Sequence, residues 1–353
     1  MPKVQGRSFT SNTTKLLKHL DKLTKIQNEE PPSPVMAHIS LTNSCNLTCS
    51  FCCFANRKMA DSLPLEAVKS ALEQFRNIGV LGVEFTGGGE PTLHPDFEEI
   101  IRYSKELGFE VGICTNGSTL GKKITKELAP LFSWVRLGMY GFYENYTYNI
   151  DIFEGTNTSI SAAYVWDEKV ETSNNPNITG DWMSEGGRKL SRNFQNKDKF
   201  YNMIDWVEKN KIPTRIAFNA IKDVSIVQED IKIVREEIND YELDRNKECE
   251  YAFLSDFNYK GERKNDHCYM HMVKPFLFTD GYIYACPSAE LSKENNYNYS
   301  SESQFAVCHW SEIEDHYSKP SYKRSHNCHY CKYAMQNELI DDILTPTQHN
   351  SFA

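Results

Sequence analysis

The chain has 353 residues, of which 40% are hydrophobic and 12% aromatic, enough for one large α/β domain with a small extension or for two modest domains. Its formal net charge of −9 argues against binding bulk nucleic acid through phosphate neutralisation, although it is compatible with a small local basic pocket. Because the chain has no apolar run of membrane-spanning length and no secretory signal, we expect a cytoplasmic protein with no membrane partner and with reduced thiols. Eleven cysteines in such a chain suit metal or cluster ligands better than disulfides.

The predicted elements begin with an amphipathic helix at 13–27 and a linker at 28–34, within an N-terminal segment 1–35. Apolar runs then alternate with helical segments. The predicted strands are 35–41, 80–85, 109–114, 134–140, 213–221 and 249–257, and the predicted helices are 64–79, 95–108, 120–132, 200–210 and 227–239. This alternation predicts a parallel sheet with right-handed crossovers. Six units are fewer than the eight of a closed barrel, so we expect an open, partial (β/α)6 TIM barrel over residues 36–260.

Residues 141–199 interrupt this alternation and are rich in Tyr, Asn, Ser, Thr and Gly. They follow the carboxyl end of a predicted strand, so we expect them over the mouth of the sheet, either as a substrate lid or as a tolerated surface insertion. Within them, residues 153–171 are compatible with a β-hairpin. Residues 261–340 form a different region, with short strands, polar loops and spaced cysteines, and the tail 341–353 is expected to be poorly ordered.

Four cysteines, Cys45, Cys49, Cys52 and Cys53, lie within nine residues just after the first predicted strand. The spacing Cys45-x3-Cys49-x2-Cys52 places three thiols on one tight loop, which suits three irons of a [4Fe–4S] cube with the fourth iron open. A structural zinc site prefers four protein ligands, and no fourth lies nearby at the usual spacing. Cys53 does not easily fill that place, because the side chains of adjacent residues usually diverge.

The segment CNLTCSFC, residues 45–52, resembles the cluster loop of radical S-adenosylmethionine (SAM) enzymes. The resemblance implies that the amino and carboxylate groups of SAM chelate the open iron, and that Phe51 lines the adenine site. A second segment, EFTGGGEPTLHP, resembles the family's Gly-Gly-Glu-Pro sequence with one more glycine. Glycines let a backbone approach a ligand, and a carboxylate can accept hydrogen bonds from the ammonium group of SAM. The implied SAM-binding residues of this segment are Gly88, Gly89 and Glu90.

Two more polar positions are assigned by the same resemblance. CTNGS, at 114–118, resembles the family's loop near the ribose, which makes Thr115 and Asn116 candidates. Asn219 lies at the end of the fifth predicted strand, where many members place a SAM-contacting residue. The alternatives are an ordinary turn residue for Asn116 and a strand-end cap for Asn219. Many members have a Ser-x-Asp-Gly segment after the fourth strand, but this chain has RLGMYG at 136–141, so Arg136 or Tyr140 would supply contacts there.

A second cysteine set lies in residues 261–340. Gly281 followed by Cys286, with a later Cys-x2-Cys pair, resembles the auxiliary-cluster extensions called SPASM and, in a shorter form, twitch. No cysteine follows the pair, so the shorter form with one auxiliary [4Fe–4S] cluster fits, although four thiolates also suit zinc. The implied ligands are Cys268, Cys286, Cys328 and Cys331.

The remaining cysteines, which are Cys53, Cys114, Cys249 and Cys308, are most simply small packing residues. Two of them have an alternative. Cys308 could replace one of the auxiliary ligands, and Cys249 could donate a hydrogen atom in an epimerase-like reaction.

The resemblance implies an enzyme that reductively cleaves SAM to a 5′-deoxyadenosyl radical, which abstracts a hydrogen atom from a substrate carbon. We expect oxidation or rearrangement of a small biosynthetic molecule with help from the auxiliary cluster. The alternative is a peptide-modifying enzyme, for which residues 1–35 are too short to be a leader-binding domain. A more remote alternative is a non-catalytic zinc or iron–sulfur module, against which the intact Gly-Gly-Glu segment argues. An electron donor such as flavodoxin or ferredoxin is the implied protein partner.

Overall fold

The structure is a computed structural model. It describes residues 13–49, 51–54, 57–166, 183–184, 188–189, 197–218, 224–254, 268–288, 300–322, 324, 331 and 333–345.

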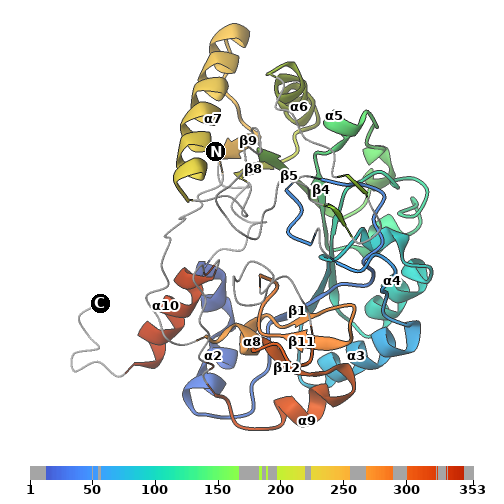
Figure 1. The fold of residues 1–353 in the computed structure, drawn as a ribbon, viewed down its shortest axis with the longest axis vertical. Helices are drawn as coiled ribbons and strands as arrows, with labels where there is room; N and C mark the ends of the chain where they lie inside the picture. Colours follow the sequence, from blue (N-terminus) through green and yellow to red (C-terminus); the bar gives the residue numbers. More distant parts are fainter. Residues whose placement is uncertain are drawn as a thin grey trace.

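A ten-stranded sheet organises the described residues (Figure 1). Its main part is a run of parallel strands in chain order: β1 (Met36–Ile39), β2 (Gly82–Phe85), β3 (Glu110–Thr115), β4 (Trp134–Gly138), β5 (Ser159–Trp166), β8 (Thr214–Phe218) and β9 (Ala252–Leu254). On the other side of β1, the sheet continues with β10 (Phe276–Leu277), which is parallel to β1, and then with the antiparallel strands β11 (Tyr282–Tyr284) and β12 (Ala306–His309). The outer strands β9 and β12 do not pair with each other. The open, mainly parallel α/β sheet confirms the predicted fold class.

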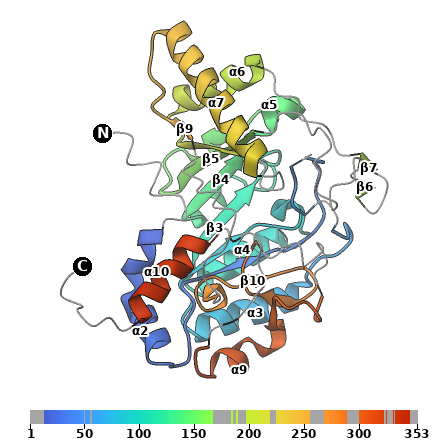
Figure 2. The same ribbon diagram turned by 60° about the vertical axis from the view of Figure 1, so that its left-hand side comes forward.

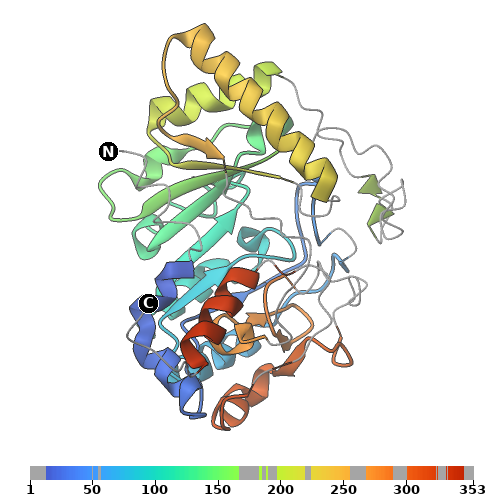
Figure 3. The same cartoon turned by 90° about the vertical axis from the view of Figure 1, so that its left-hand side faces the viewer.

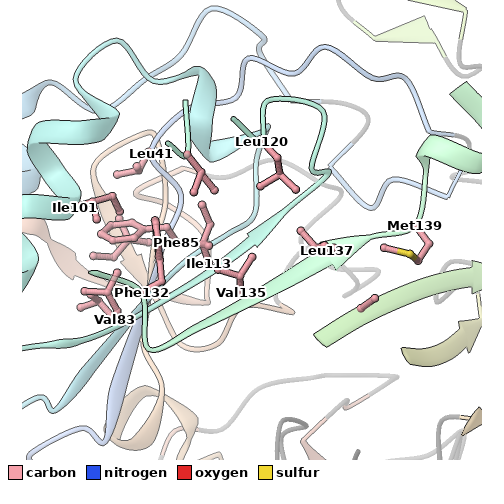
Figure 4. Packing of buried hydrophobic residues seen from close by; sticks show 14 of the residues in the cluster. Leu41, Val83, Phe85, Ile101, Ile113, Leu120, Phe132, Val135, Leu137 and Met139 are labelled. Carbon is pink, nitrogen blue, oxygen red and sulfur yellow. The ribbon is translucent and has the colours of Figure 1, made fainter. Parts of the chain in front are cut away.

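Helices cover the outer face of this sheet, as Figures 1 and 3 show. They are α3 (Leu65–Asn77), α4 (Phe97–Glu106), α6 (Lys197–Asn210) and α7 (Val224–Arg245), close to the predicted helices at 64–79, 95–108, 200–210 and 227–239. Every second strand residue packs under them, because side chains alternate between the two faces of a strand. Phe85 of β2 and Ile113 of β3 lie near Ile101 of α4 in the core shown in Figure 4. No helix in the described part of the chain is long and apolar enough to cross a membrane.

The predicted hairpin at 153–171 is wrong. Residues 159–166 instead form β5, which pairs in parallel with β4 and β8 inside the main sheet. Its Tyr164 and Trp166 pack on Phe200 of α6, with ring centroids 5.4 and 5.2 Å apart. The connection between β4 and β5 contains only α5 (Gly141–Glu144) and the 3₁₀ turn η5 (Ile150–Phe153), so no long helix marks a strand–helix unit there.

Of the remaining interruption, the structure describes only a two-stranded ribbon, β6 (Met183–Ser184) with β7 (Arg188–Lys189), which is separate from the main sheet (Figure 2). Residues 167–182, 185–187 and 190–196 lie outside the described residues. Whether this segment is a lid or a surface insertion therefore stays a prediction.

The predicted helix at 120–132 is also wrong. Gly121 adopts a φ of +81°, and its N–H donates to the carbonyl of Ile124 at 2.8 Å, which closes a turn instead of a helix. The hydroxyl of Thr125 then accepts from the N–H of Leu128 at 3.2 Å. Local hydrogen bonds of this kind compete with helix formation, even where the apolar residues have helical spacing. Only the short 3₁₀ turn η4 (Ala129–Leu131) follows.

The two ends of the described chain pack together. The predicted N-terminal helix forms as the 3₁₀ segment η2 (Thr13–His19) and α2 (Leu20–Gln27), and α10 (Ala334–Leu344) lies beside it in Figures 1 and 2. Because α10 continues to Leu344, residues 341–344 are helical and the poorly ordered tail was predicted to begin too early. The short helices α8 (Met270–Val273) and α9 (Ile313–Tyr317) complete this end of the molecule.

Candidate functional site

The predicted cluster loop follows β1 at the carboxyl edge of the sheet. Arg57 fastens it, because Nε donates to the carbonyl of Asn43 at 2.7 Å and Nη1 donates to the carbonyl of Phe54 at 2.7 Å. The same Nη1 lies 3.5 Å from Sγ of Cys52, and the N–H of Cys52 donates to the carbonyl of Cys49 at 3.2 Å. The loop is thus closed on itself around one guanidinium group.

Cys45, Cys49, Cys52 and Cys53 are all partly buried in this loop. In the described residues no three His, Cys, Asp or Glu side chains are close enough together to hold a metal ion, so the sulfurs of the loop do not converge here. Burial raises the pKa of the Cys45 thiol. Three soft thiol donors on one loop at this edge of the sheet fit an iron–sulfur group in chemistry and position. Which of them are ligands stays a prediction.

The glycine loop after β2 packs directly on the chain that leads into the cysteines. Gly88 adopts a φ of +52°, and a Cβ at this position would lie 2.5 Å from Oδ1 of Asn43. A Cβ at Gly89 would collide with the carbonyl of Ser44. The N–H of Gly89 donates to the carbonyl of Thr42 at 2.7 Å. The glycines therefore serve the packing of two loops, besides any approach to a ligand that the sequence predicts.

Glu90 connects three loops through its backbone and its buried carboxylate, and the residue is 3% exposed. Its N–H donates to the carbonyl of Ser44 at 2.8 Å. Its carboxylate accepts from the hydroxyl groups of Thr92 and Thr115, both at 2.7 Å, and from the N–H of Asn116 at 2.7 Å. Burial raises the pKa of Glu90, and these hydrogen bonds oppose the rise. The structure thus shows Glu90 as a residue that positions the site. Its contact with the ammonium group of SAM stays a prediction.

Asn116 joins the loop after β3 to the cysteine loop. Its Nδ2 donates to Oδ1 of Asn46 at 2.8 Å, and its Oδ1 accepts from the N–H of Ser118 at 2.9 Å. Nδ2 of Asn46 donates back to the hydroxyl of Ser118 at 2.8 Å, which closes a polar ring. The bond to residue i+2 is the turn geometry that was the alternative for Asn116. Asn219 lies outside the described residues.

Aromatic side chains lie beside the cysteine loop. The rings of Phe51 and Tyr140 have centroids 5.4 Å apart. Tyr140 covers the backbone of Gly138 at the end of β4, where a Cβ would collide with its ring. Arg136 lies deeper in the same strand, with its guanidinium 5.0 Å from the ring centroid of Trp134. The two residues proposed to replace the missing hydroxyl therefore occupy different levels, Tyr140 at the edge of the sheet and Arg136 within it.

Three of the four predicted auxiliary ligands border one apolar cluster, although no three metal-ligating side chains of the described residues lie close enough together to hold a metal ion. Cys268 is a buried member of this cluster, Cys286 and Cys331 pack against it, and Cys328 lies outside the described residues. Asn337 of α10 lies between two of these cysteines. Its Oδ1 accepts from the N–H of Tyr269, the residue after Cys268, at 2.8 Å, and its Nδ2 lies 3.8 Å from Sγ of Cys331. The apolar side chains of this auxiliary cluster region include Leu16, Leu23, Ile26, Met270, Met272, Tyr333 and Ile340.

Gly281 and Cys308 also have defined positions in the C-terminal region. Gly281 has a φ of +88°, and its N–H donates to the carbonyl of Phe278 at 3.0 Å, so it forms the turn between β10 and β11. Cys308 lies on β12, where it is the strand partner of Ile283 of β11. It belongs to the main hydrophobic core and not to the cluster that contains Cys268. Its placement favours a packing role over the alternative role as an auxiliary ligand.

The other cysteines predicted to pack differ from one another. Cys249 is buried in the main core, as predicted, and its role as a hydrogen donor is not tested. Cys114 points to the opposite face of the sheet, where its thiol donates to Oε1 of Glu84 at 3.2 Å. Cys114 is therefore part of a polar group. The contact depends on the pairing of β2 with β3, which no local pattern shows.

Several residues that hold the site together were not predicted from the sequence. No short motif identifies them, because each acts through a contact that is distant in sequence or is made to the backbone. They are Asn46, Arg57 and Ser118.

Comparison with known proteins places this arrangement in a family. Residues 39–159 match the Radical SAM superfamily, whose cofactors are SAM and a [4Fe–4S] cluster. An S-adenosylmethionine-dependent nucleotide dehydratase from Selenomonas ruminantium is 34% identical over 83 residues, which are 24% of this chain and 30% of that protein. An Fe-coproporphyrin III synthase from Methanosarcina barkeri is 26% identical over 238 residues, which are 64% of this chain and 53% of that protein. The chain thus spans about half or less of the length of these relatives.

A solved structure supports the fold. The Streptococcus suis protein SuiB, bound to its precursor peptide SuiA, aligns with a TM-score of 0.50 and 17% identity, covering 88% of this chain and 71% of that chain. At this identity the likeness concerns the fold alone. The family match runs from β1 to the start of β5 and includes the cysteine loop, the glycine loop and the loop after β3. This chain therefore carries a radical SAM domain, at residues 39–159.

Proposed function

We propose that the protein is a radical SAM enzyme that abstracts a hydrogen atom from a carbon of a small biosynthetic molecule and so oxidises or rearranges it. The observation that carries this proposal is that three loops meet at the carboxyl edge of the sheet. The cysteine loop, the glycine loop and the loop after β3 are joined by Glu90 and by the ring of Asn46, Asn116 and Ser118. Ligand sites of open parallel sheets lie at this edge.

In the proposed site, Cys45, Cys49 and Cys52 hold a [4Fe–4S] cluster. When bound and reduced, this cluster and SAM supply the 5′-deoxyadenosyl radical. Gly88, Gly89 and Glu90 form the platform beside the cysteine loop. The remaining proposed SAM contacts are Phe51, Thr115, Asn116 and Asn219. The tight packing of Gly89 on Ser44 fixes the position of this platform relative to the cysteines. Such fixed geometry is what radical chemistry requires of a protein.

We further propose an auxiliary [4Fe–4S] cluster held by Cys268, Cys286, Cys328 and Cys331. The grouping of the three described cysteines in one apolar cluster supports it. A zinc ion with the same ligands is the alternative. The proposal includes an electron donor such as flavodoxin or ferredoxin and a cytoplasmic location, where the thiols stay reduced.

A peptide substrate is the alternative to a small molecule. SuiB, which shares the fold, is bound to a precursor peptide. Incubation with candidate peptides and small molecules under reducing conditions, followed by mass spectrometry of each, separates the two.

The proposal is tested by anaerobic reconstitution with iron and sulfide, followed by metal analysis and an assay for 5′-deoxyadenosine under reduction. We expect about eight irons per chain, as two four-iron clusters require. A content of about four irons and one zinc would show that zinc occupies the auxiliary site and that the cluster of the radical SAM site is present. Absence of 5′-deoxyadenosine, with fully loaded protein and reductant present, would contradict the enzyme proposal.

A further inference from the structure

The connection between β4 and β5 lies against the loop after β3, residues 116–119, and two tyrosines make the contact. The hydroxyl of Tyr146 donates to the carbonyl of Asn116 across the two loops. The ring of Tyr148 lies on Gly117, where a Cβ would be 2.7 Å from Cδ1 of that ring. Gly117 has a φ of +76°, and its lack of a side chain admits the ring at this turn. Two consecutive residues of the loop after β3 are therefore held by one neighbouring segment.

Tyr148 anchors this segment to the rest of the fold. Its hydroxyl donates to the carbonyl of Gly138 at the end of β4 and accepts from the N–H of Gly141, both at 2.7 Å. The residue is 8% exposed, and the centroid of its ring lies 5.3 Å from that of Trp206 on α6. The ring of Tyr146 packs edge-on against Tyr148, with centroids 5.4 Å apart. Because Tyr148 is fixed by a strand and a helix, it gives Tyr146 a defined position.

Tyr146 completes the hydrogen bonding of Asn116. The N–H of Asn116 donates to the carboxylate of Glu90 in the glycine loop at 2.7 Å, and its Nδ2 donates to Oδ1 of Asn46 in the cysteine loop at 2.8 Å. The carbonyl of Asn116 accepts from Tyr146. Burial raises the pKa of the Tyr146 phenol, so the hydroxyl keeps its proton at neutral pH and remains a donor. Asn116 is thus held by hydrogen bonds from three different segments of the chain.

The segment after β4 departs from the family pattern at the point where these tyrosines follow. Its sequence at 136–141 is RLGMYG in place of the Ser-x-Asp-Gly of many members. Tyr146 and Tyr148 come next in the chain and act on the loop after β3, which carries Asn116, a proposed SAM contact. A hydrogen bond between two loops limits the conformations that each can adopt, and preorganised contact residues bind a ligand with a smaller loss of entropy. The tyrosines therefore control the mobility of one proposed part of the SAM site.

We propose that Tyr146, held in place by Tyr148, positions the loop after β3 for SAM binding. Tyr146 is a positioning residue, because its hydroxyl contacts the backbone of Asn116 and acts through it. The inference rests on the proposed function, in which Asn116 contacts SAM. It adds an indirect contribution of the segment after β4 to the direct contacts expected from Arg136 or Tyr140.

Two measurements on Tyr146→Phe, which removes the hydroxyl and keeps the ring, test this inference. The first is hydrogen–deuterium exchange of the full, reconstituted chain without SAM, in which we expect the amides of residues 116–118 to exchange faster than in the wild type. The second is isothermal titration of the same chain with SAM. We expect an affinity about fivefold weaker, which corresponds to the net contribution of about 1 kcal/mol of a typical hydrogen bond. Part of the binding free energy would then be needed to order the loop.

Two further variants separate positioning from stability. Tyr103→Phe is the matched control, because the hydroxyl of Tyr103 donates to Glu73 between the outer helices α3 and α4, and it should change neither the exchange of residues 116–118 nor the SAM affinity. Tyr148→Phe removes a hydroxyl whose two hydrogen bonds stay within the segment after β4. It should lower the free energy of unfolding more than Tyr146→Phe does, but weaken SAM binding less, by about twofold. A role in stability alone would give the two variants the same order in both measurements.

The outcomes distinguish this inference from the proposed function. Faster exchange in Tyr146→Phe with SAM affinity equal to that of the wild type would overturn the inference, since the hydroxyl would then serve the fold alone. Unchanged exchange of residues 116–118 would overturn it as well. Both results leave the proposed function intact, because the wild type still binds SAM. Absence of SAM binding to the wild type would reject the proposed function, and the inference with it.

Discussion

The two cysteine regions of this molecule are built in opposite ways. The cysteine loop, residues 45–53, carries all its thiols on one short segment and is held by polar contacts from Arg57 and from the glycine loop. The auxiliary cluster region collects Cys268, Cys286 and Cys331 from separate segments and holds them by apolar packing of α2, α8 and α10. The first proposed ligand set depends mainly on local chain geometry, and the second proposed set depends on tertiary packing. Changes in packing should therefore affect the second set and spare the first.

The largest effect is expected for the cysteine loop itself. Cys45→Ala, Cys49→Ala and Cys52→Ala should each abolish the SAM-binding cluster, because a three-thiol site has no spare ligand. Iron analysis and electron paramagnetic resonance of the reduced protein measure the loss. Cys53→Ala is the matched control and should keep the cluster. If Cys53→Ala were as damaging as the others, the assignment of the loop would be wrong.

Removing apolar packing should separate the two regions. Ile340 of α10 is fully buried in the auxiliary cluster region, so Ile340→Ala leaves a cavity. Such cavities lower the free energy of unfolding by about 2–5 kcal/mol. We expect loss of auxiliary iron, with SAM affinity unchanged in titrations.

Leu20→Ala is the control for this packing variant, since Leu20 lies on α2 and is 57% exposed. It should keep all iron. Equal loss of iron from both sites in Ile340→Ala would show that the regions are not independent, and would contradict the comparison.

A polar change should affect the first region. Glu90→Gln replaces a carboxylate that accepts from Thr92, Thr115 and Asn116 by an amide, whose NH₂ group cannot accept. The donor left unsatisfied should lower the free energy of unfolding by about 1–3 kcal/mol, measured in urea, and weaken SAM binding. Auxiliary iron should not change. Glu98→Gln, on the exposed surface of α4, is the control.

The difference in unfolding free energy between the wild type and Glu90→Gln should change with pH in one direction. The pKa of Glu90 is raised above its usual value of 4.5, so the folded state binds the proton more tightly than the unfolded state does. The stability that Glu90 contributes is therefore present below pH 4.5 and decreases as the pH rises through the raised pKa. Glutamine does not titrate. The difference in unfolding free energy between the wild type and Glu90→Gln should narrow with rising pH, and a widening difference would contradict this account.

The sequence predicted those parts of the fold and site that depend on local pattern. Apolar runs beside glycine-terminated helices predicted most of the parallel strands. The Cys45-x3-Cys49-x2-Cys52 spacing predicted a single ligand loop, which stays a prediction. The match at 39–159 to the radical SAM superfamily confirms the family that these motifs indicated. Such features are readable because neighbouring residues determine them.

The parts that failed depend on contacts distant in sequence. Strand β5 was missed because no long helix precedes it and its burial depends on Phe200 of α6. The prediction of a helix at 120–132 was wrong because the positive φ of Gly121 and the hydroxyl of Thr125 favour turns, although the apolar residues have helical spacing. Arg57 of the cysteine loop carries no motif, since its role follows from loop closure.

The smallest effect is expected for Cys308, which distinguishes the two regions most finely. Cys308 lies between Cys286 and Cys331 in sequence, yet it packs with Ile283 in the main core. Burial raises the pKa of its thiol to about 12, so the thiol stays protonated at neutral pH. Cys308→Ala should lower the free energy of unfolding by about 1 kcal/mol, as the loss of one small buried group does, and should leave iron content unchanged. Cys331→Ala should lose the auxiliary iron in the same assay, and loss of iron in Cys308→Ala instead would exchange the assigned ligands.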